Sequence, residues 1–190
     1  AGTLGGDVDW IRSHLSADTV FTDLSPDRTK IDVQGPKSRE IIEDIAGQVL
    51  PDLGYFKFVD GELFGVPMTI SRTGYTGEWG YEFYFAADQG IAVWNKFCED
   101  GRIKPAGLGA RDTLRLEMGY SLYGHELNNQ MTPAGATQGM FIDLLQHFIG
   151  KKAVAHELKN LRQVLLPLEL ESKRAAREGD QARAQRRASA

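Results

Sequence analysis

Glu82 is the residue whose setting in this chain most suggests chemistry. Three glycines spaced three apart, Gly74, Gly77 and Gly80, allow a tight turn just before it. Strict alternation over 81–85 then predicts a strand with aromatic residues on one face and Glu82 with Tyr84 on the other. A carboxylate on that outer face can accept hydrogen bonds from a ligand, although most carboxylates in such hairpins are simply solvated.

Three more residues have both a chemical and a structural interpretation. Asp7 opens an apolar pattern of helical spacing over 7–15, so it also fits a helix N-cap or first turn. Arg111 lies in the clearest helical pattern, 107–119, where an ion pair with a nearby acid is the alternative to binding an anion. The single cysteine, Cys98, falls on an apolar stripe, which favours a buried thiol over a nucleophile.

The elements that must position these residues alternate between short strands and helices. Apolar alternation predicts strands at 19–24, 30–34, 55–59, 63–71, 81–85 and 163–170, with a tight hairpin at Asp60-Gly61. Helical spacing predicts helices at 7–15, 36–46, 90–99, 107–119 and 151–158. Residues 172–190 are poor in hydrophobic side chains and are not expected to order alone. By itself, this pattern indicates a soluble α+β chain.

Composition excludes several classes of function. The chain has 190 residues, of which 42% are hydrophobic and 25% charged, and its net charge is −4. No overall positive field favours nucleic acid or an anionic membrane, and no apolar run is long enough to span a bilayer. The four histidines lack metal-ligand spacing, and phosphate-loop, dinucleotide-binding and zinc-protease motifs are missing. We therefore expect a cytoplasmic protein with no metal, no nucleic-acid partner and no membrane association.

Three longer stretches resemble one known family. They read SRTGYTGEWGYEFY (71–84), GLGARDTLRLEMGYSLYGHEL (107–127) and FIGKKA (148–153). In order and spacing they are similar to the folate-binding aminomethyltransferases, the family of the glycine cleavage system T-protein. The opening AGTLGGDVDWI (1–11) resembles the family segment that carries a catalytic aspartate, with its first asparagine cut off. The resemblance extends over about residues 1–170.

The resemblance implies a fold and a division of the chain. The family fold is α+β, with antiparallel sheets and packed helices in two lobes around a folate channel. This chain is then expected to be a fragment without the N-terminal portion and the C-terminal barrel. Residues 1–52 would form a partial first lobe and 53–160 a second lobe with the folate motifs. Residues 161–190 would begin the barrel and end in a flexible tail.

The resemblance also implies an activity. The family moves a one-carbon unit from an aminomethyl-lipoyl carrier, the H-protein, to tetrahydrofolate and releases ammonia. Glu82 matches the glutamate that binds the pterin, and Tyr75 and Tyr120 match tyrosines of the pterin pocket. Arg111 matches the arginine that meets folate, where its planar cation suits the carboxylates of the tail. Asp7 matches the catalytic aspartate near the reacting nitrogens.

One segment departs from the family pattern and keeps other functions open. Residues 132–140 read TPAGATQGM where TPVEAGLGW is usual, which bears on the donor side of the channel. The alternatives are another folate-dependent one-carbon enzyme of this fold, such as a demethylase or a sarcosine- or dimethylglycine-type domain, and a non-catalytic folate-binding protein. An inert structural fragment is a further alternative.

The resemblance makes two further expectations testable. We expect Glu82, Tyr75 and Arg111 to line one cavity, with Asp7 at its mouth or across from it. We also expect the isolated chain to bind tetrahydrofolate weakly or not at all, because other parts of the family fold would supply the remaining walls of the channel.

Overall fold

The computed structural model describes residues 3–136 and 138–161. The contacts of the chain divide it into two compact units, Ala1–Tyr120 and Ser121–Ala190. The predicted strand at 163–170 and the predicted segment 161–190 therefore lie outside the described residues, apart from residue 161 itself. The elements in chain order are α1 (Leu4–Ser13), η1 (Ser25–Asp27), β1 (Arg28–Gln34), α2 (Ser38–Ala46), β2 (Phe58–Leu63), β3 (Val66–Ser71), β4 (Gly80–Ala86), η2 (Ala87–Gln89), α3 (Gly90–Cys98), α4 (Leu108–Glu117) and η3 (Gly139–Phe141).

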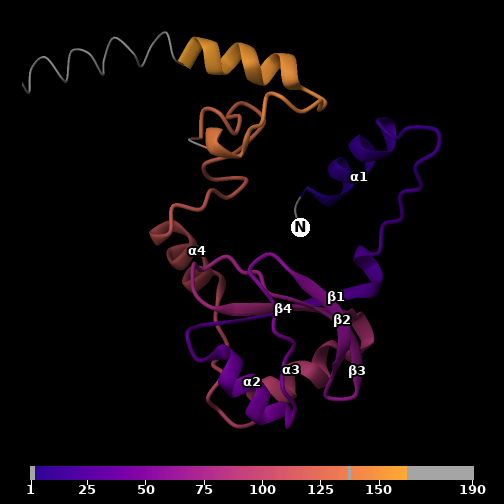
Figure 1. The fold of residues 1–190 in the computed structure, drawn as a ribbon, viewed down its shortest axis with the longest axis vertical. Helices are drawn as coiled ribbons and strands as arrows, with labels where there is room; N and C mark the ends of the chain where they lie inside the picture. Colours follow the sequence, from indigo (N-terminus) through magenta and orange to yellow (C-terminus); the bar gives the residue numbers. More distant parts are fainter. Residues whose placement is uncertain (1–2, 137, 162–190) are drawn as a thin grey trace, which may run out of the picture. The chain divides into compact units, whose positions relative to one another are not determined.

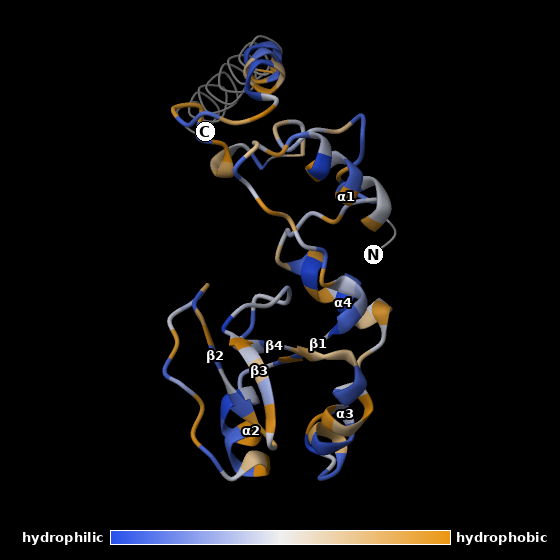
Figure 2. Ribbon diagram, turned by 90° about the vertical axis from the view of Figure 1, so that its right-hand side faces the viewer, coloured by the Kyte–Doolittle hydropathy of each residue, from blue (hydrophilic) through white to orange (hydrophobic). Residues whose placement is uncertain are grey.

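The first unit is built on one antiparallel sheet, in the order β1-β4-β3-β2. Helices α2 and α3 cover one face of this sheet (Figure 1). Both helices mix hydrophobic and hydrophilic residues, as expected of helices with one face on a core (Figure 2). The predicted α+β class is confirmed.

The core lies between this sheet and its two helices. Alternation along β4 is strict, because Tyr81, Phe83 and Phe85 are fully buried while Glu82 and Tyr84 lie on the other face. Ile42 of α2 and Phe97 of α3 belong to the same buried cluster. The outer face of β4 is thus left for polar chemistry, as the sequence predicts.

Three predicted local structures are wrong. The strand predicted at 55–59 begins only at Phe58, because Phe56 has a positive φ of 60°. Residues 19–24 form no strand, and Val20 is 90% exposed, because no neighbouring strand pairs with this segment in the described chain. Asp60-Gly61 is not a hairpin, because β2 continues through it. The chain turns at Phe64 and Gly65, whose positive φ values of 56° and 75° suit a two-residue hairpin turn.

One sheet also runs across the predicted boundary after residue 52, because β1 precedes that boundary and pairs along its whole length with β4. The predicted boundaries after residues 52 and 160 remain predictions.

The second unit is described over 121–136 and 138–161. It contains short bridges, η3 and a helical stretch at 151–161, which confirms the helix predicted at 151–158. The Thr132 hydroxyl donates a hydrogen bond to Glu157 of that stretch. This bond connects the helical stretch to segment 132–140, whose sequence differs from the family pattern.

Candidate functional site

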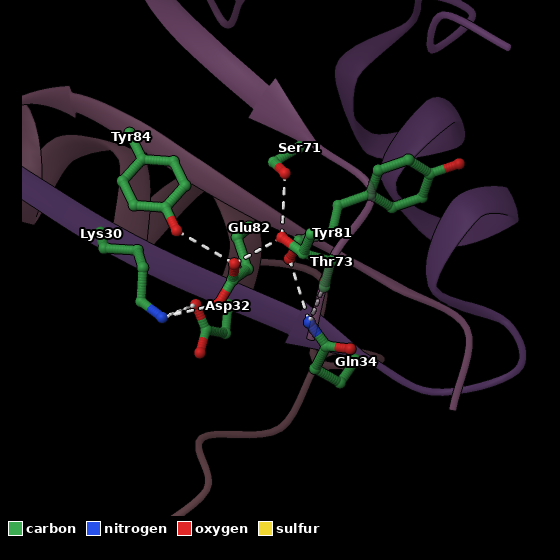
Figure 3. A network of polar contacts seen from close by, with 8 residues as sticks. All are labelled: Lys30, Asp32, Gln34, Ser71, Thr73, Tyr81, Glu82 and Tyr84. Atoms are coloured by element: carbon green, nitrogen blue, oxygen red, sulfur yellow. Dashed lines mark hydrogen bonds and ion pairs between the residues drawn. The ribbon is translucent and has the colours of Figure 1, made fainter. Parts of the chain in front are cut away.

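The carboxylate of Glu82 is held on the outer face of the sheet by three donors. Lys30 Nζ lies 2.6 Å from Oε1, while the Thr73 hydroxyl lies 2.5 Å and the Tyr84 hydroxyl 3.0 Å from Oε2 (Figure 3). The donors come from β1, from the connection after β3 and from β4 itself. Three separate segments therefore fix the orientation of this carboxylate.

These contacts decide the charge of Glu82. Burial acts to raise its pKa, but the hydrogen bonds from Lys30, Thr73 and Tyr84, together with the charge of Lys30, outweigh burial and lower it. Burial likewise acts to lower the pKa of Lys30, and its two carboxylate partners raise it overall. At neutral pH the site therefore presents an ionised carboxylate beside an ionised lysine.

A second carboxylate stands directly across from the first. Asp32 of β1 is the register partner of Glu82, and its Oδ1 lies 3.1 Å from Lys30 Nζ. Burial raises the pKa of Asp32, and the charge of Glu82 adds to this, while Lys30 and Arg111 oppose it. The environment therefore shifts the pKa of Asp32 upward and that of Glu82 downward.

An aromatic pair and a cation form the other part of the site. The rings of Tyr75 and Tyr120 stack with centroids 5.6 Å apart, and Arg111 Cζ lies 4.8 Å from the Tyr75 centroid. Arg111 of α4 thus lies over a tyrosine ring, and no ion pair of its guanidinium is found in the described chain. The rival interpretation of Arg111 as one half of an intrahelical ion pair is not supported.

The two parts of the site are connected on both sides. On one side is Tyr55, whose pKa is raised by burial. The charge and hydrogen bonding of Tyr120 raise this pKa further, and so does the charge of Glu82, so Tyr55 interacts with both parts of the site. On the other side, Arg111 acts on Asp32, which shares Lys30 with Glu82. The structure thus brings together four of the five sequence-predicted site residues, namely Glu82, Tyr75, Tyr120 and Arg111.

A cavity of about 1010 Å³ opens along β1 beside this site. Tyr75 and Arg111 line it, together with Lys30 and Asp32, whereas Glu82 does not. We expected Glu82, Tyr75 and Arg111 to line one cavity. Tyr75 and Arg111 do so, and Glu82 does not. Glu82 adjoins this cavity through its shared lysine.

Asp7 is not among the residues brought together. It lies within the first turn of α1, where its carboxylate accepts a 2.8 Å hydrogen bond from the Thr3 hydroxyl. The N-cap position belongs to Thr3, so the alternative interpretation of Asp7 as an N-cap is wrong, while its placement in the first turn is confirmed. No residue of α1 is buried. The catalytic role of Asp7 stays a prediction.

The connection between β3 and β4 carries one further stacked pair. Arg72 Cζ lies 3.3 Å from the centroid of the Trp79 ring, and Arg72 Nη1 donates to the Leu53 carbonyl at 3.3 Å. The Trp79 carbonyl accepts from the Ser38 hydroxyl at 3.1 Å and from the Gly35 amide at 2.7 Å. These contacts hold the connection that carries Tyr75 against the start of α2.

Sequence reasoning missed the residues that surround Glu82. Alternation over 30–34 already places Lys30 and Asp32 on the face opposite Ile31 and Val33. The missing information was the partner strand, because pairing of β1 with β4 joins residues about fifty positions apart. No group of three or more histidine, cysteine or acidic side chains in the described ranges is arranged to hold a metal ion. Likewise, none of the helices described is both long and apolar enough to cross a membrane.

Comparison with known proteins places this arrangement in a family. The profile of the GCVT N-terminal domain matches residues 1–146. The chain belongs to the GCVT N-terminal domain family. Among the relatives of this GCVT-family chain, an aminomethyltransferase from Chloroherpeton thalassium is 40% identical over 184 residues, which are 94% of this chain and 51% of that protein. An aminomethyltransferase from Exiguobacterium sibiricum is 38% identical over 180 residues, with shares of 94% and 50%.

A solved structure agrees with this family membership. The glycine cleavage system aminomethyltransferase T from Bartonella henselae matches with a TM-score of 0.73 at 27% identity, over 84% of this chain and 44% of that one. This GCVT-family chain spans about half the length of the curated relatives it matches. The resemblance inferred from the three sequence stretches is confirmed at the level of the family.

Proposed function

We propose that the chain is part of a tetrahydrofolate-dependent aminomethyltransferase of the glycine cleavage system. In this reaction an aminomethyl group on the lipoyl arm of the H-protein gives its carbon to tetrahydrofolate, and ammonia is released. The relatives named aminomethyltransferase support the proposal. The single observation that carries it is an oriented, ionised Glu82 whose partner Lys30 lines the same cavity as Tyr75 and Arg111. With these partners, we expect the activity in the cytoplasm.

Glu82 fits a ligand edge that carries N–H donors. Each carboxylate oxygen has two acceptor positions. At Oε1 one of them is taken by Lys30, while Thr73 and Tyr84 take both positions at Oε2. A pterin edge with two donors therefore finds one position open and gains the second when the Tyr84 hydroxyl turns aside. Tyr84 is 36% exposed, so solvent can receive it.

The remaining residues suit the rest of a folate. The pyrimidine ring at the pterin end of tetrahydrofolate is planar, and the stacked rings of Tyr75 and Tyr120 offer it a flat apolar surface. Arg111 offers its carboxylate tail a planar cation. Tetrahydrofolate itself supplies the two nitrogens that receive the carbon. We assign Asp7 the task of stabilising charge near those nitrogens.

Binding of tetrahydrofolate by variants of the full-length protein that contains this chain, the parent, tests the proposal. Glu82→Ala should weaken binding about tenfold to a hundredfold, because a part-buried charged acceptor is lost. Arg111→Ala should weaken binding less, and the loss should shrink at high salt, because its pairing with the tail is screened. Titration calorimetry at two ionic strengths, with ligand-detected NMR where the heat is small, measures both.

Matched controls are available on the same unit. Glu62 of β2 and Arg12 of α1 are exposed, so Glu62→Ala and Arg12→Ala should leave binding unchanged. If Glu82→Ala binds tetrahydrofolate as well as the full-length parent does, the pterin assignment is wrong.

A further inference from the structure

Lys30 stands between two carboxylates that face each other across neighbouring strands. Asp32 and Glu82 are register partners of β1 and β4, and Lys30 lies two residues before Asp32 on the same face. Lys30 Nζ is 3.1 Å from Asp32 Oδ1 and 2.6 Å from Glu82 Oε1 (Figure 3). Opposite residues of an antiparallel pair lie close enough for like charges to repel, so this pairing requires a counter-ion.

The three groups are withdrawn from water to different degrees. The side chain of Glu82 is 13% exposed, that of Asp32 is 29% exposed and that of Lys30 is 39% exposed. Screening by water is therefore weakest at Glu82.

Other groups face this cluster from every element around it. Thr73 and Tyr84 donate hydrogen bonds to Glu82, as does Lys30. The charge of Glu82 also raises the pKa of Tyr55. From α4, Arg111 acts on Asp32. None of these groups bridges the two carboxylates, and in the described chain Lys30 alone contacts both.

We propose that Lys30 and Asp32 are positioning residues for Glu82: Lys30 neutralises the facing Asp32 and holds Oε1, so that Glu82 stays ionised and aimed outward for a ligand. The three groups together carry one net negative charge. A hydrogen-bond-donating or cationic ligand edge is therefore favoured at Glu82, and an anionic edge is disfavoured. Only the nature of the ligand rests on the proposed function, because the positioning itself is a property of the free chain.

Removing Lys30 and removing the charge of Asp32 should shift the pKa of Glu82 in opposite directions. Without Lys30, the two carboxylates lose their counter-ion and share a proton, so Glu82 becomes protonated at a higher pH than in the parent. Without the charge of Asp32, the repulsion is gone and Lys30 serves Glu82 alone, so Glu82 becomes protonated at a lower pH. A lysine with a merely structural role would give neither pattern.

The first experiment needs no ligand. Carbon-13 NMR of the glutamate carboxyl groups, with Glu82→Gln to assign the resonance, follows the titration of Glu82 in the full chain. We expect the pKa of Glu82 to rise in Lys30→Met, to fall in Asp32→Asn and to return toward the parent value in the double variant. Lys96→Met, an exposed lysine of α3, is the control without effect. An unchanged Glu82 pKa in both single variants overturns the inference.

The second experiment uses tetrahydrofolate as the probe. In the full-length parent protein, at a pH between the Glu82 pKa of the parent and that of Lys30→Met, Lys30→Met should bind it about tenfold more weakly than the parent. Its binding should recover as the pH is raised, and the double variant should regain most of the loss. If the titration pattern appears but the full-length parent does not bind tetrahydrofolate, the proposed function fails and the positioning stands. If binding in Lys30→Met is lost without pH dependence and without rescue, the positioning fails.

Discussion

At Glu82, burial and hydrogen bonding oppose each other, and the hydrogen bonds win. The side chain is 13% exposed, and three donors lower its pKa below the ordinary value of 4.5. A carboxyl group whose pKa is lower in the folded state stabilises the fold above its unfolded pKa. That stability is lost as the pH falls through the folded pKa. The network around Glu82 should therefore weaken in acid.

Replacement of Glu82 by glutamine tests this balance. At pH 7 we expect Glu82→Gln to lower the free energy of unfolding by about 1–2 kcal/mol, because charged hydrogen bonds become neutral ones. The difference from the parent should shrink as the pH is lowered from above 4.5 through the folded pKa, because the parent then loses the same charge. Urea unfolding at pH 7, 4 and 3 measures the difference, with Glu62→Gln as control. A difference that stays constant with pH would contradict this account.

Sequence reasoning at the residue scale found side chains but not their neighbours. Strict alternation placed Glu82 on the outer face, because a strand has a period of two. The opposition of Asp32 and Glu82 depends on the register between two strands, and register is set by the assembled sheet. No local pattern in the chain carries that information.

At the scale of elements, the connection into β4 is closed by one glutamine between two glycines. The Gln34 amide donates to the carbonyls of Thr73 at 3.1 Å and Tyr81 at 3.3 Å. A Cβ atom added to Gly74 or to Gly80 would overlap this amide. The two glycines thus leave space for the Gln34 side chain of β1, which holds the turn that carries Tyr75 by hydrogen bonds.

Gly80→Ala should therefore destabilise the chain. We expect a loss of about 1–3 kcal/mol, because the Gln34 amide must leave its two carbonyl partners in a part-buried place. Gly109 of α4 has no atom within 4 Å of an added Cβ, so Gly109→Ala should instead stabilise by up to about 1 kcal/mol. Thermal and urea unfolding of the two variants should shift in opposite directions. Equal shifts would show that Gln34 gives way without cost.

The elements that sequence reasoning misplaced share a physical cause. Residues 19–24 are apolar enough for a strand, but a strand also requires a partner. Asp60-Gly61 has the composition of a tight turn, yet Gly61 pairs with Met68 inside the ladder because the hairpin closes four residues later. Turn composition is a local preference, and pairing of the two hydrophobic strands overrides it.

At the scale of the whole molecule, the largest buried cluster lies within the first unit. Its buried members run from Ile31 to Phe97 and come from the sheet, α2, α3 and the segment after α2. The matching fold could be named from sequence because the motifs of 71–84 and 107–127 are long. The order of the four strands could not be derived, because several orders bury the same alternating faces.

A shortened chain tests whether this unit is self-sufficient. Because the cluster is complete by residue 97, we expect residues 1–120 alone to unfold in one cooperative transition. Leu50→Ala, which empties a fully buried position, should cost about 2–5 kcal/mol in this shortened chain. Circular dichroism during thermal unfolding measures both. A broad, non-cooperative transition would show that the first unit does not fold alone.

The guanidinium of Arg72 lies on the ring of Trp79, so the connection between β3 and β4 can be followed by tryptophan fluorescence. The chain has three tryptophans, and Trp10 and Trp94 belong to α1 and α3, away from the connection between β3 and β4. An indole whose face carries a cation at 3.3 Å from its centroid is quenched and shifted differently from one that faces water. With the other two tryptophans changed to phenylalanine, the emission of Trp79 would report whether its stack with Arg72 is intact.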